Sequence, residues 1–180
     1  MPLQQHFRLR YRHIAASAGE LGYEVPIANL ARPGLLLYGV APMASVYDGL
    51  LRPTLRLYSR VAVVRELPAG HGVAYGRTYI TDKPTRVATI GIGYADGWPR
   101  SLSGKGARVY INGHYCTMLG RVTMDQIMVD VTHMPRVQPG DVAEIMGPNV
   151  PWSELTSRAR TIPSNIITSI SGRVPRVYKS

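Results

Sequence analysis

The stretch that decides the fold is "ARVYINGHYCTML", residues 107–119. Apolar and polar residues alternate on both sides of Asn112–Gly113, as they do in strands with one buried face. Asn-Gly between two β-rich runs is a strong signal for a two-residue hairpin, because both turn positions favour a positive φ. This stretch therefore predicts a tight antiparallel hairpin.

Runs of similar texture lie on both sides of the predicted hairpin. They alternate well enough for strands and end in turns rich in Gly, Pro or Asp, such as "PAGHG", "ADGWP" and "QPGD". The runs cover residues 57–67, 85–94, 125–134 and 142–147. Five or six strands with regularly spaced turns predict an antiparallel barrel or sandwich, so the fold class is mainly β.

The two ends of the chain have a different pattern. Residues 152–172 are predicted to be helical in two pieces, with Ser153 as a possible cap and Pro163 as the break. Leu35–Leu37 is a continuous apolar run, as in a strand buried on both faces of a parallel sheet. We therefore expect residues 1–48 to be the last βα units of a parallel barrel plus a linker, and residues 49–180 to be the β domain.

Composition indicates a packed globular protein, since 45% of residues are hydrophobic and 18% are charged. No run approaches the ~18 apolar residues of a membrane span, and residues 1–12 lack the apolar stretch of a signal peptide. The single cysteine, Cys116, cannot form an intrachain disulfide, which favours a cytoplasmic location.

The net charge of +10 leaves two classes of partner open. A nucleic-acid-binding protein would concentrate its basic residues in a stripe, whereas these are scattered along the chain. We interpret most of them as solvated surface and expect no nucleic-acid partner. The excess charge could still assist binding of an anionic ligand.

Two motifs near the N-terminus could bind an anion. "ARPG", residues 31–34, places Arg32 in an extended conformation because it precedes proline, and Gly34 lets a ligand approach the backbone. "HIAAS", residues 13–17, offers the Ser17 hydroxyl to a phosphate. The alternatives are a simple strand-to-turn junction for "ARPG" and a buried structural histidine for His13.

The stretch "GVAYGRTYI", residues 72–80, sets Tyr75 between very small neighbours. A strand that only filled a core would use bulkier flanks, so the pattern indicates space for a molecule to approach Tyr75. "GYADGWP" (93–99) predicts a tight turn in which Tyr94 could simply pack. In "GRVTMDQIMVDVT" (120–132), the alternative to a functional role is a salt bridge between Arg121 and Asp125. No metal-ligand spacing is present.

Taken together and in this order, "HIAAS", "ARPGLLLYG", "VAYGRTY", "IGYADGWPR", "GRVTMDQIMVDVT" and "GRVPRVY" resemble the alanine racemase family. The resemblance implies a pyridoxal-phosphate enzyme with an N-terminal (β/α)₈ barrel and a C-terminal β domain. Its members are cytoplasmic homodimers that share the active site between subunits and make D-alanine, a peptidoglycan precursor. The cofactor lysine belongs to an N-terminal segment that this chain lacks, so the chain alone is predicted to be inactive.

The resemblance also assigns roles to individual residues. Tyr75 matches one of the two bases that move a proton on opposite faces of the substrate, and a phenol needs nearby positive charge or hydrogen bonds to do so. The other matches concern the cofactor or the substrate: Arg32 faces the pyridine nitrogen, His13 buttresses Arg32, Ser17 and Gly34 contact the phosphate, Met124 offers its amide to the substrate carboxylate, and Tyr94 and Arg121 line the entrance.

Three departures from the family pattern bear on the substrate. Ala16 and Thr123 replace a common asparagine and cysteine, and Ser164 is aligned with a tyrosine that binds the cofactor phosphate. The resemblance implies alanine as the substrate, and the departure at Ser164 keeps serine, or a broader range, as the alternative. The alternative from another class is a non-catalytic basic β-barrel that serves as a binding module.

Overall fold

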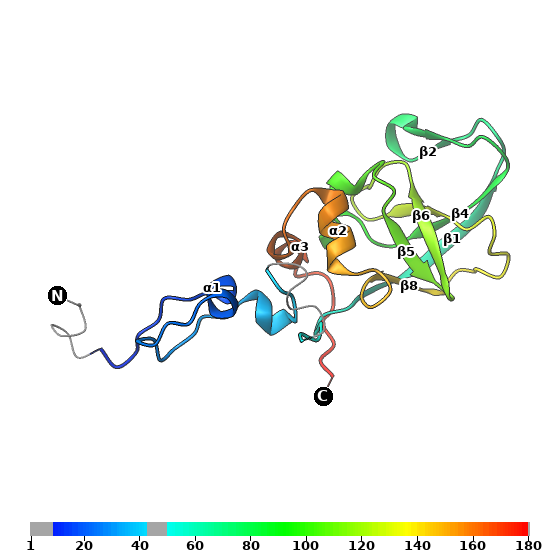
Figure 1. Ribbon diagram of the computed structural model, residues 1–180. Helices are drawn as coiled ribbons and strands as arrows, with labels where there is room; N and C mark the ends of the chain where they lie inside the picture. Colours follow the sequence, from blue (N-terminus) through cyan, green and yellow to red (C-terminus); the bar gives the residue numbers. More distant parts are fainter. Residues whose placement is uncertain (1–8, 43–49, 180) are drawn as a thin grey trace. The chain divides into compact units, whose positions relative to one another are not determined.

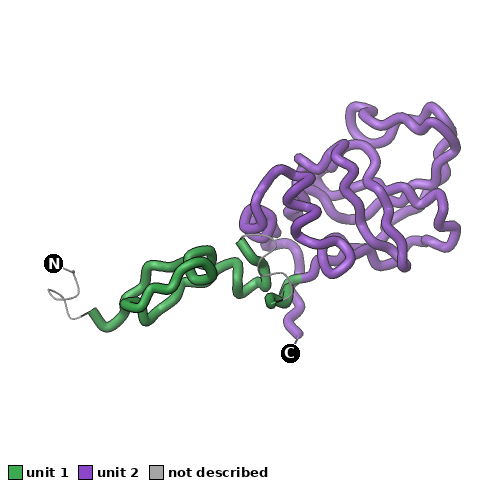
Figure 2. The backbone as a smooth tube through the Cα atoms, in the orientation of Figure 1, with its two compact units in different colours: residues 1–55 green, residues 56–180 purple. Residues whose placement is uncertain are grey.

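A computed structural model describes residues 9–42 and 50–179. The chain forms two compact units, residues 1–55 and residues 56–180 (Figure 2). The predicted boundary between residues 48 and 49 lies outside the described residues. Among the described residues, no helix is long and apolar enough to cross a membrane.

The second unit is built on a closed barrel of six antiparallel strands (Figure 1). The order around the barrel is β1-β4-β7-β6-β5-β8, with β8 pairing back to β1. Closure leaves no free strand edge. The prediction of a mainly β fold is confirmed, and the barrel is the form adopted. The strands are β1 (Leu57–Leu67), β4 (Thr85–Ile90), β5 (Arg108–Ile111), β6 (His114–Leu119), β7 (Ile127–Asp130) and β8 (Val142–Met146).

The predicted hairpin joins β5 to β6. Asn112 and Gly113 form the turn with φ of 46° and 88°, and Ile111 pairs with His114. Val109, Ile111 and Cys116 are fully buried. The alternation seen in the sequence therefore directs one face of the hairpin into the barrel core.

Strand β1 is long enough to pair with two neighbouring strands. Its first half pairs with β8 and its second half with β4, with register shifts at Leu57/Tyr58 and Val61/Val63. Such irregularities bend a strand and increase its twist, which a small closed barrel requires. Beyond β1, a two-stranded arm of β2 (Gly72–Val73) and β3 (Tyr79–Ile80) leaves the barrel and returns to it (Figure 1).

Two helices follow the barrel, as predicted: α2 (Trp152–Ala159) and α3 (Pro163–Ser169). Pro163 occupies the first turn of α3, where its missing N–H costs nothing. The prediction that Ser153 caps the first helix is wrong, because the cap position is Pro151 and Ser153 lies within the first turn. Trp152, Leu155 and Ala159 form the buried face of α2.

The first unit contains α1 (Ser17–Gly22) and a short 3₁₀ helix, η2 (Leu35–Tyr38). The one strand-like pairing among its described residues is a parallel bridge between Ala16 and Arg32. The prediction that Leu35–Leu37 forms a buried strand is wrong. The run winds into η2, none of whose residues is buried, and Gly39 ends it in the left-handed conformation.

Candidate active site

Tyr75 lies in a turn at the end of the β2–β3 arm. The turn is η3 (Tyr75–Arg77), which lies between the short strands β2 and β3. Ala74, Gly76 and Arg77 all have a positive φ, of 61°, 71° and 46°, which a pleated strand does not allow. This backbone turns the Tyr75 side chain outward, and 73% of its surface is exposed.

The loop between β6 and β7 packs against the Tyr75 turn. Gly120, at φ 70°, approaches so closely that a Cβ there would lie 2.7 Å from the Val73 carbonyl oxygen. The Arg121 guanidinium lies against Gly76, 3.4 Å from where a Cβ would stand. Positive charge thus lies beside the turn that carries Tyr75.

The same loop packs against a second turn, η4 (Tyr94–Asp96). The Tyr94 amide donates to the Thr123 carbonyl at 3.0 Å, and the Ala95 amide donates to the Met124 carbonyl at 3.0 Å. Gly93 makes this possible, because a Cβ there would lie 2.3 Å from both carbonyl oxygens. Residues 120–125 therefore connect the Tyr75 turn to the Tyr94 turn.

The segment after α3 braces this arrangement. Arg173 donates from Nε to Asp96 at 2.7 Å and from Nη2 to Asp125 at 2.5 Å. Hydrogen bonds to Asp96 and Asp125 raise the pKa of Arg173 above its usual range. Asp96 also accepts from the Gly93 amide at 2.8 Å. The alternative of a salt bridge between Arg121 and Asp125 is wrong, because Asp125 pairs with Arg173 instead.

Four of the predicted site residues are thereby brought onto adjoining loops of the second unit: Tyr75, Tyr94, Arg121 and Met124. The Tyr94 and Met124 side chains are 43% and 53% exposed. Among the described residues, none accepts a hydrogen bond from the Met124 amide. These adjoining loops thus carry two phenols, a guanidinium and, among the described residues, an unpaired N–H donor, a set of groups that suits a small molecule with a carboxylate.

Three of the predicted cofactor residues come together in the first unit. The Ser17 hydroxyl accepts from the Gly34 amide at 2.9 Å, and Arg32 donates from Nη2 to the Ile14 carbonyl at 3.2 Å. The Ala16–Arg32 bridge holds these two segments side by side. His13 is exposed and makes no hydrogen bond to Arg32.

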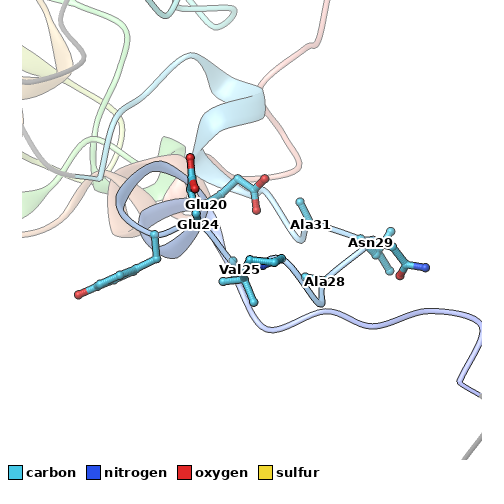
Figure 3. A pocket seen from close by; sticks show the side chains of 10 residues that line it. Glu20, Glu24, Val25, Ala28, Asn29 and Ala31 are labelled. Carbon is cyan, nitrogen blue, oxygen red and sulfur yellow. The ribbon is translucent and has the colours of Figure 1, made fainter. Parts of the chain in front are cut away.

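A separate hollow in the first unit is lined in part by carboxylates (Figure 3). Glu20 and Glu24 line it together with Val25, Ala28 and Asn29. Two carboxylates repel a phosphate, and neither Ser17 nor Arg32 is among the lining residues. This hollow is therefore distinct from the predicted cofactor residues above.

The second unit matches a known protein family. The family described as "Alanine racemase, C-terminal domain" matches residues 54–178. The chain belongs to the alanine racemase family. The matched range includes the barrel, both helices and all the loops of the second unit that carry the candidate site.

Individual relatives extend the match into the first unit. The alanine racemase of Carboxydothermus hydrogenoformans is 43% identical over 176 residues, which is 94% of this chain and 48% of the relative. A crystal structure of alanine racemase from Bartonella henselae with covalently bound pyridoxal phosphate superposes with a TM-score of 0.86 at 39% identity, covering 93% of this chain and 46% of that one. The alanine racemase of Streptomyces coelicolor gives 0.88 at 38% identity, covering 98% and 47%. The chain spans about half the length of these relatives.

The first unit of this alanine racemase chain fits one part of pyridoxal phosphate, the phosphate. There the Ser17 hydroxyl accepts from the Gly34 amide and keeps its own proton to donate, and Gly34 has open space where a Cβ would be. The three lysines, Lys83, Lys105 and Lys179, all lie in the second unit, so the first unit itself contains no lysine to which the cofactor could be attached.

Ser164 lies in the first turn of α3, where its carbonyl accepts from the Thr168 hydroxyl at 2.8 Å. Its own hydroxyl caps no helix, since Ile162 holds the cap position without a side-chain bond. Its predicted contact with the cofactor phosphate stays a prediction.

Sequence reasoning missed the residues that brace the site: Gly93, Asp96, Gly120 and Arg173. The available signals were the density of Gly and Asp in "GYADGWP" and the paired arginines of "GRVPR". Cys116 has no part in the site. Its burial, followed by the charge of Asp130, raises the pKa of the thiol to about 11, which leaves it unreactive.

Proposed function

We propose that this chain is the C-terminal portion of a pyridoxal-phosphate-dependent alanine racemase in which Tyr75 is one of two acid–base groups. The observation that carries the proposal is that Tyr75, Tyr94, Arg121 and a Met124 amide without an acceptor among the described residues lie on adjoining loops. The names and coverage of the relatives support it.

Tyr75 suits proton transfer for three reasons. Its ring is open to a substrate, its turn is shaped by positive-φ backbone and by contact with Gly120, and the Arg121 guanidinium brings positive charge to the same turn, against Gly76. Racemisation removes the α-proton from one face of the substrate and returns a proton to the other. A phenol held in place can serve as the acid–base group on one of those two faces.

The neighbouring loops would orient the substrate. A carboxylate would accept from the Met124 amide, which has no other acceptor among the described residues. Tyr94 and Arg121 border the same surface and would restrict what reaches it. Such positioning lowers the entropic cost of the reaction.

Ser17, Gly34 and Arg32 would hold the cofactor in the complete enzyme. When bound, pyridoxal phosphate supplies an electron sink for the negative charge that develops at the substrate α-carbon. The Ser17 hydroxyl and the backbone at Gly34 would bind the phosphate. Arg32, which stays protonated, would face the ring nitrogen and keep it unprotonated.

In this proposal the complete enzyme is a cytoplasmic homodimer that supplies D-alanine for peptidoglycan. Alanine is the preferred substrate and serine the alternative, which the absence of a tyrosine at Ser164 would favour. Comparing alanine with serine as substrates of the chimera described next would decide between them.

A chimera tests the activity directly. This chain would replace the matching C-terminal half of the Carboxydothermus hydrogenoformans alanine racemase, and interconversion of L- and D-alanine would be measured. We expect racemisation by the chimera and none by the N-terminal half alone. An inactive but folded, cofactor-loaded chimera would overturn the proposal.

Tyr75→Phe in the chimera isolates the proposed base, since it keeps the ring and removes the hydroxyl. Racemisation should fall about 10²–10⁴-fold, equally in both directions, because the equilibrium between enantiomers is fixed. Exchange of the α-hydrogen with D₂O, followed by NMR, should instead fall much more for one enantiomer than for the other. Tyr58→Phe, on an exposed tyrosine of β1, is the matched control. Equal and small losses of exchange for both enantiomers would show that Tyr75 is not the base.

A further inference from the structure

Arg173 joins two loops that carry different parts of the candidate site. Asp96 belongs to the same turn as Tyr94, and Asp125 directly follows Met124. Both carboxylates bind the one guanidinium of Arg173. The arginine therefore bridges the Tyr94 turn and the Met124 loop through their charged residues.

Removing the guanidinium would do more than remove two hydrogen bonds. The carboxylates of Asp96 and Asp125 would remain, directed at the same position with no positive charge between them. Two carboxylates directed at the same position repel each other. The Asp96 side chain is only 15% exposed, so water would screen this repulsion poorly. The repulsion would act where the Tyr94 and Ala95 amides donate hydrogen bonds to the Met124 loop.

The backbone that carries Arg173 is itself fixed. Arg176 donates to the Ser171 carbonyl at 2.5 Å and to the Ile170 carbonyl at 2.9 Å. The Ser171 amide donates to the Asp96 carbonyl at 3.2 Å, and a Cβ on Gly97 would lie 2.5 Å from the Ser169 carbonyl oxygen. Arg173 thus acts from a rigid segment and not from a free tail.

The bridge is poorly suited to stabilise the fold as a whole. Arg173 and Asp125 are 48% and 59% exposed, and ion pairs between exposed groups contribute little to folding. Its consequence is local, at the junction of the two loops.

We propose that Arg173 is a positioning residue that fixes the separation between Tyr94 and the Met124 backbone. The effect on substrate rests on the proposed function, whereas the effect on loop geometry does not.

Amide hydrogen exchange of the 180-residue chain, measured by NMR, tests the geometry. Arg173→Gln should accelerate exchange of the Tyr94 and Ala95 amides at least about tenfold, and leave the β5–β6 hairpin within about twofold. Arg173→Lys, with one ammonium for two carboxylates, should give an intermediate effect. Arg136→Gln removes the same charge from an exposed arginine that makes no contact with the site, and should change neither region.

The double variant Arg173→Gln/Asp125→Asn separates positioning from general destabilisation. It removes the repulsion, so exchange at Tyr94 and Ala95 should slow again, although neither contact of Arg173 has been restored. Unchanged exchange in Arg173→Gln, a uniform increase over the whole barrel, or no recovery in the double variant would each overturn the proposal.

The chimera provides the functional measurement. Arg173→Gln should raise the KM for alanine about tenfold with kcat within about threefold, and Asp125→Asn should recover part of the loss. A fall in kcat at unchanged KM would contradict a role in placing the substrate-binding loop. If the unmodified chimera is inactive, the proposed function fails, and amide exchange still decides the role of Arg173.

Discussion

At the scale of single residues, the site depends on the absence of a side chain at Gly93. Gly93 has an ordinary extended backbone, so its role is steric, and a Cβ would lie 2.3 Å from the Thr123 and Met124 carbonyl oxygens. Gly93→Ala should therefore separate the Tyr94 turn from the Met124 loop. Because backbone cannot move aside cheaply, we expect a loss of about 1–3 kcal/mol in the free energy of unfolding.

Urea denaturation of the 180-residue chain would measure this loss. Gly91→Ala is the control, since it lies two residues earlier and its nearest neighbour would be Ser59 Oγ at 3.8 Å. Its effect should stay within about 0.5 kcal/mol. Equal denaturation midpoints for the two variants would show that the close approach at Gly93 does not contribute to the free energy of unfolding.

The sequence identifies the residues that face outward better than those that brace them. Tyr75, Tyr94 and Met124 stand in recognisable motifs. The partners of Arg173 lie 77 and 48 positions away, and only the closed barrel brings them together. Proximity in sequence suggested a pair between Arg121 and Asp125, and the tertiary structure gave each of them a different neighbour.

At the scale of elements, local information explains which predictions succeed. Asn112–Gly113 specifies its hairpin through its own backbone preferences, and β1 follows from alternation alone. A strand at Leu35–Leu37 would instead require flanking strands on both sides. The described part of the first unit offers only the bridge at Ala16–Arg32, and a Pro-Gly pair precedes the run. The apolar run therefore forms a single 3₁₀ turn.

Helix α2 is joined to the barrel by a charged cluster that makes stability depend on pH. Glu154 accepts from Arg108 of β5 at 2.9 Å and from Arg158 at 3.0 Å. Burial opposes its ionisation, but the hydrogen bonds from Arg108 and Arg158 outweigh burial and lower the pKa of Glu154. An unfolded glutamate has a pKa of ~4.3, so this contribution is fully present above about pH 4.3 and is lost as the pH falls through the lower, folded-state pKa.

Glu154→Gln should accordingly lower the free energy of unfolding by about 1 kcal/mol at pH 7, and by progressively less as the solution is acidified below pH ~4. Denaturation curves at several pH values would measure the difference from the unmodified chain. Glu66→Gln removes a longer, exposed pair with Arg86 at 3.6 Å and should have little effect at any pH. A deficit for Glu154→Gln that is constant with pH would refute the ion-pair explanation.

At the scale of the whole molecule, the predicted acid–base residue and most of the predicted cofactor residues belong to different units, Ser164 being the exception. Tyr75 lies in residues 56–180, whereas Ser17 and Arg32 lie in residues 1–55, which contain no lysine. We expect the 180-residue chain alone to show no racemase activity and no lysine-linked cofactor absorbance at a specific site. Turnover of alanine by the purified chain would contradict this.

The final prediction concerns which subunit completes each site. If the enzyme is a homodimer whose sites are shared, Tyr75 of one subunit serves the cofactor held by the other. A Tyr75→Phe chimera and a chimera without its cofactor lysine are each inactive. In mixed dimers of the two, one site receives both defects and the other receives neither. Equal mixing with random exchange should then recover roughly a quarter of the unmodified activity, because half of the dimers are mixed and each has one intact site. Sites built from a single subunit would give no recovery in mixed dimers whose formation is verified by two affinity tags, because every site would then carry one of the two defects.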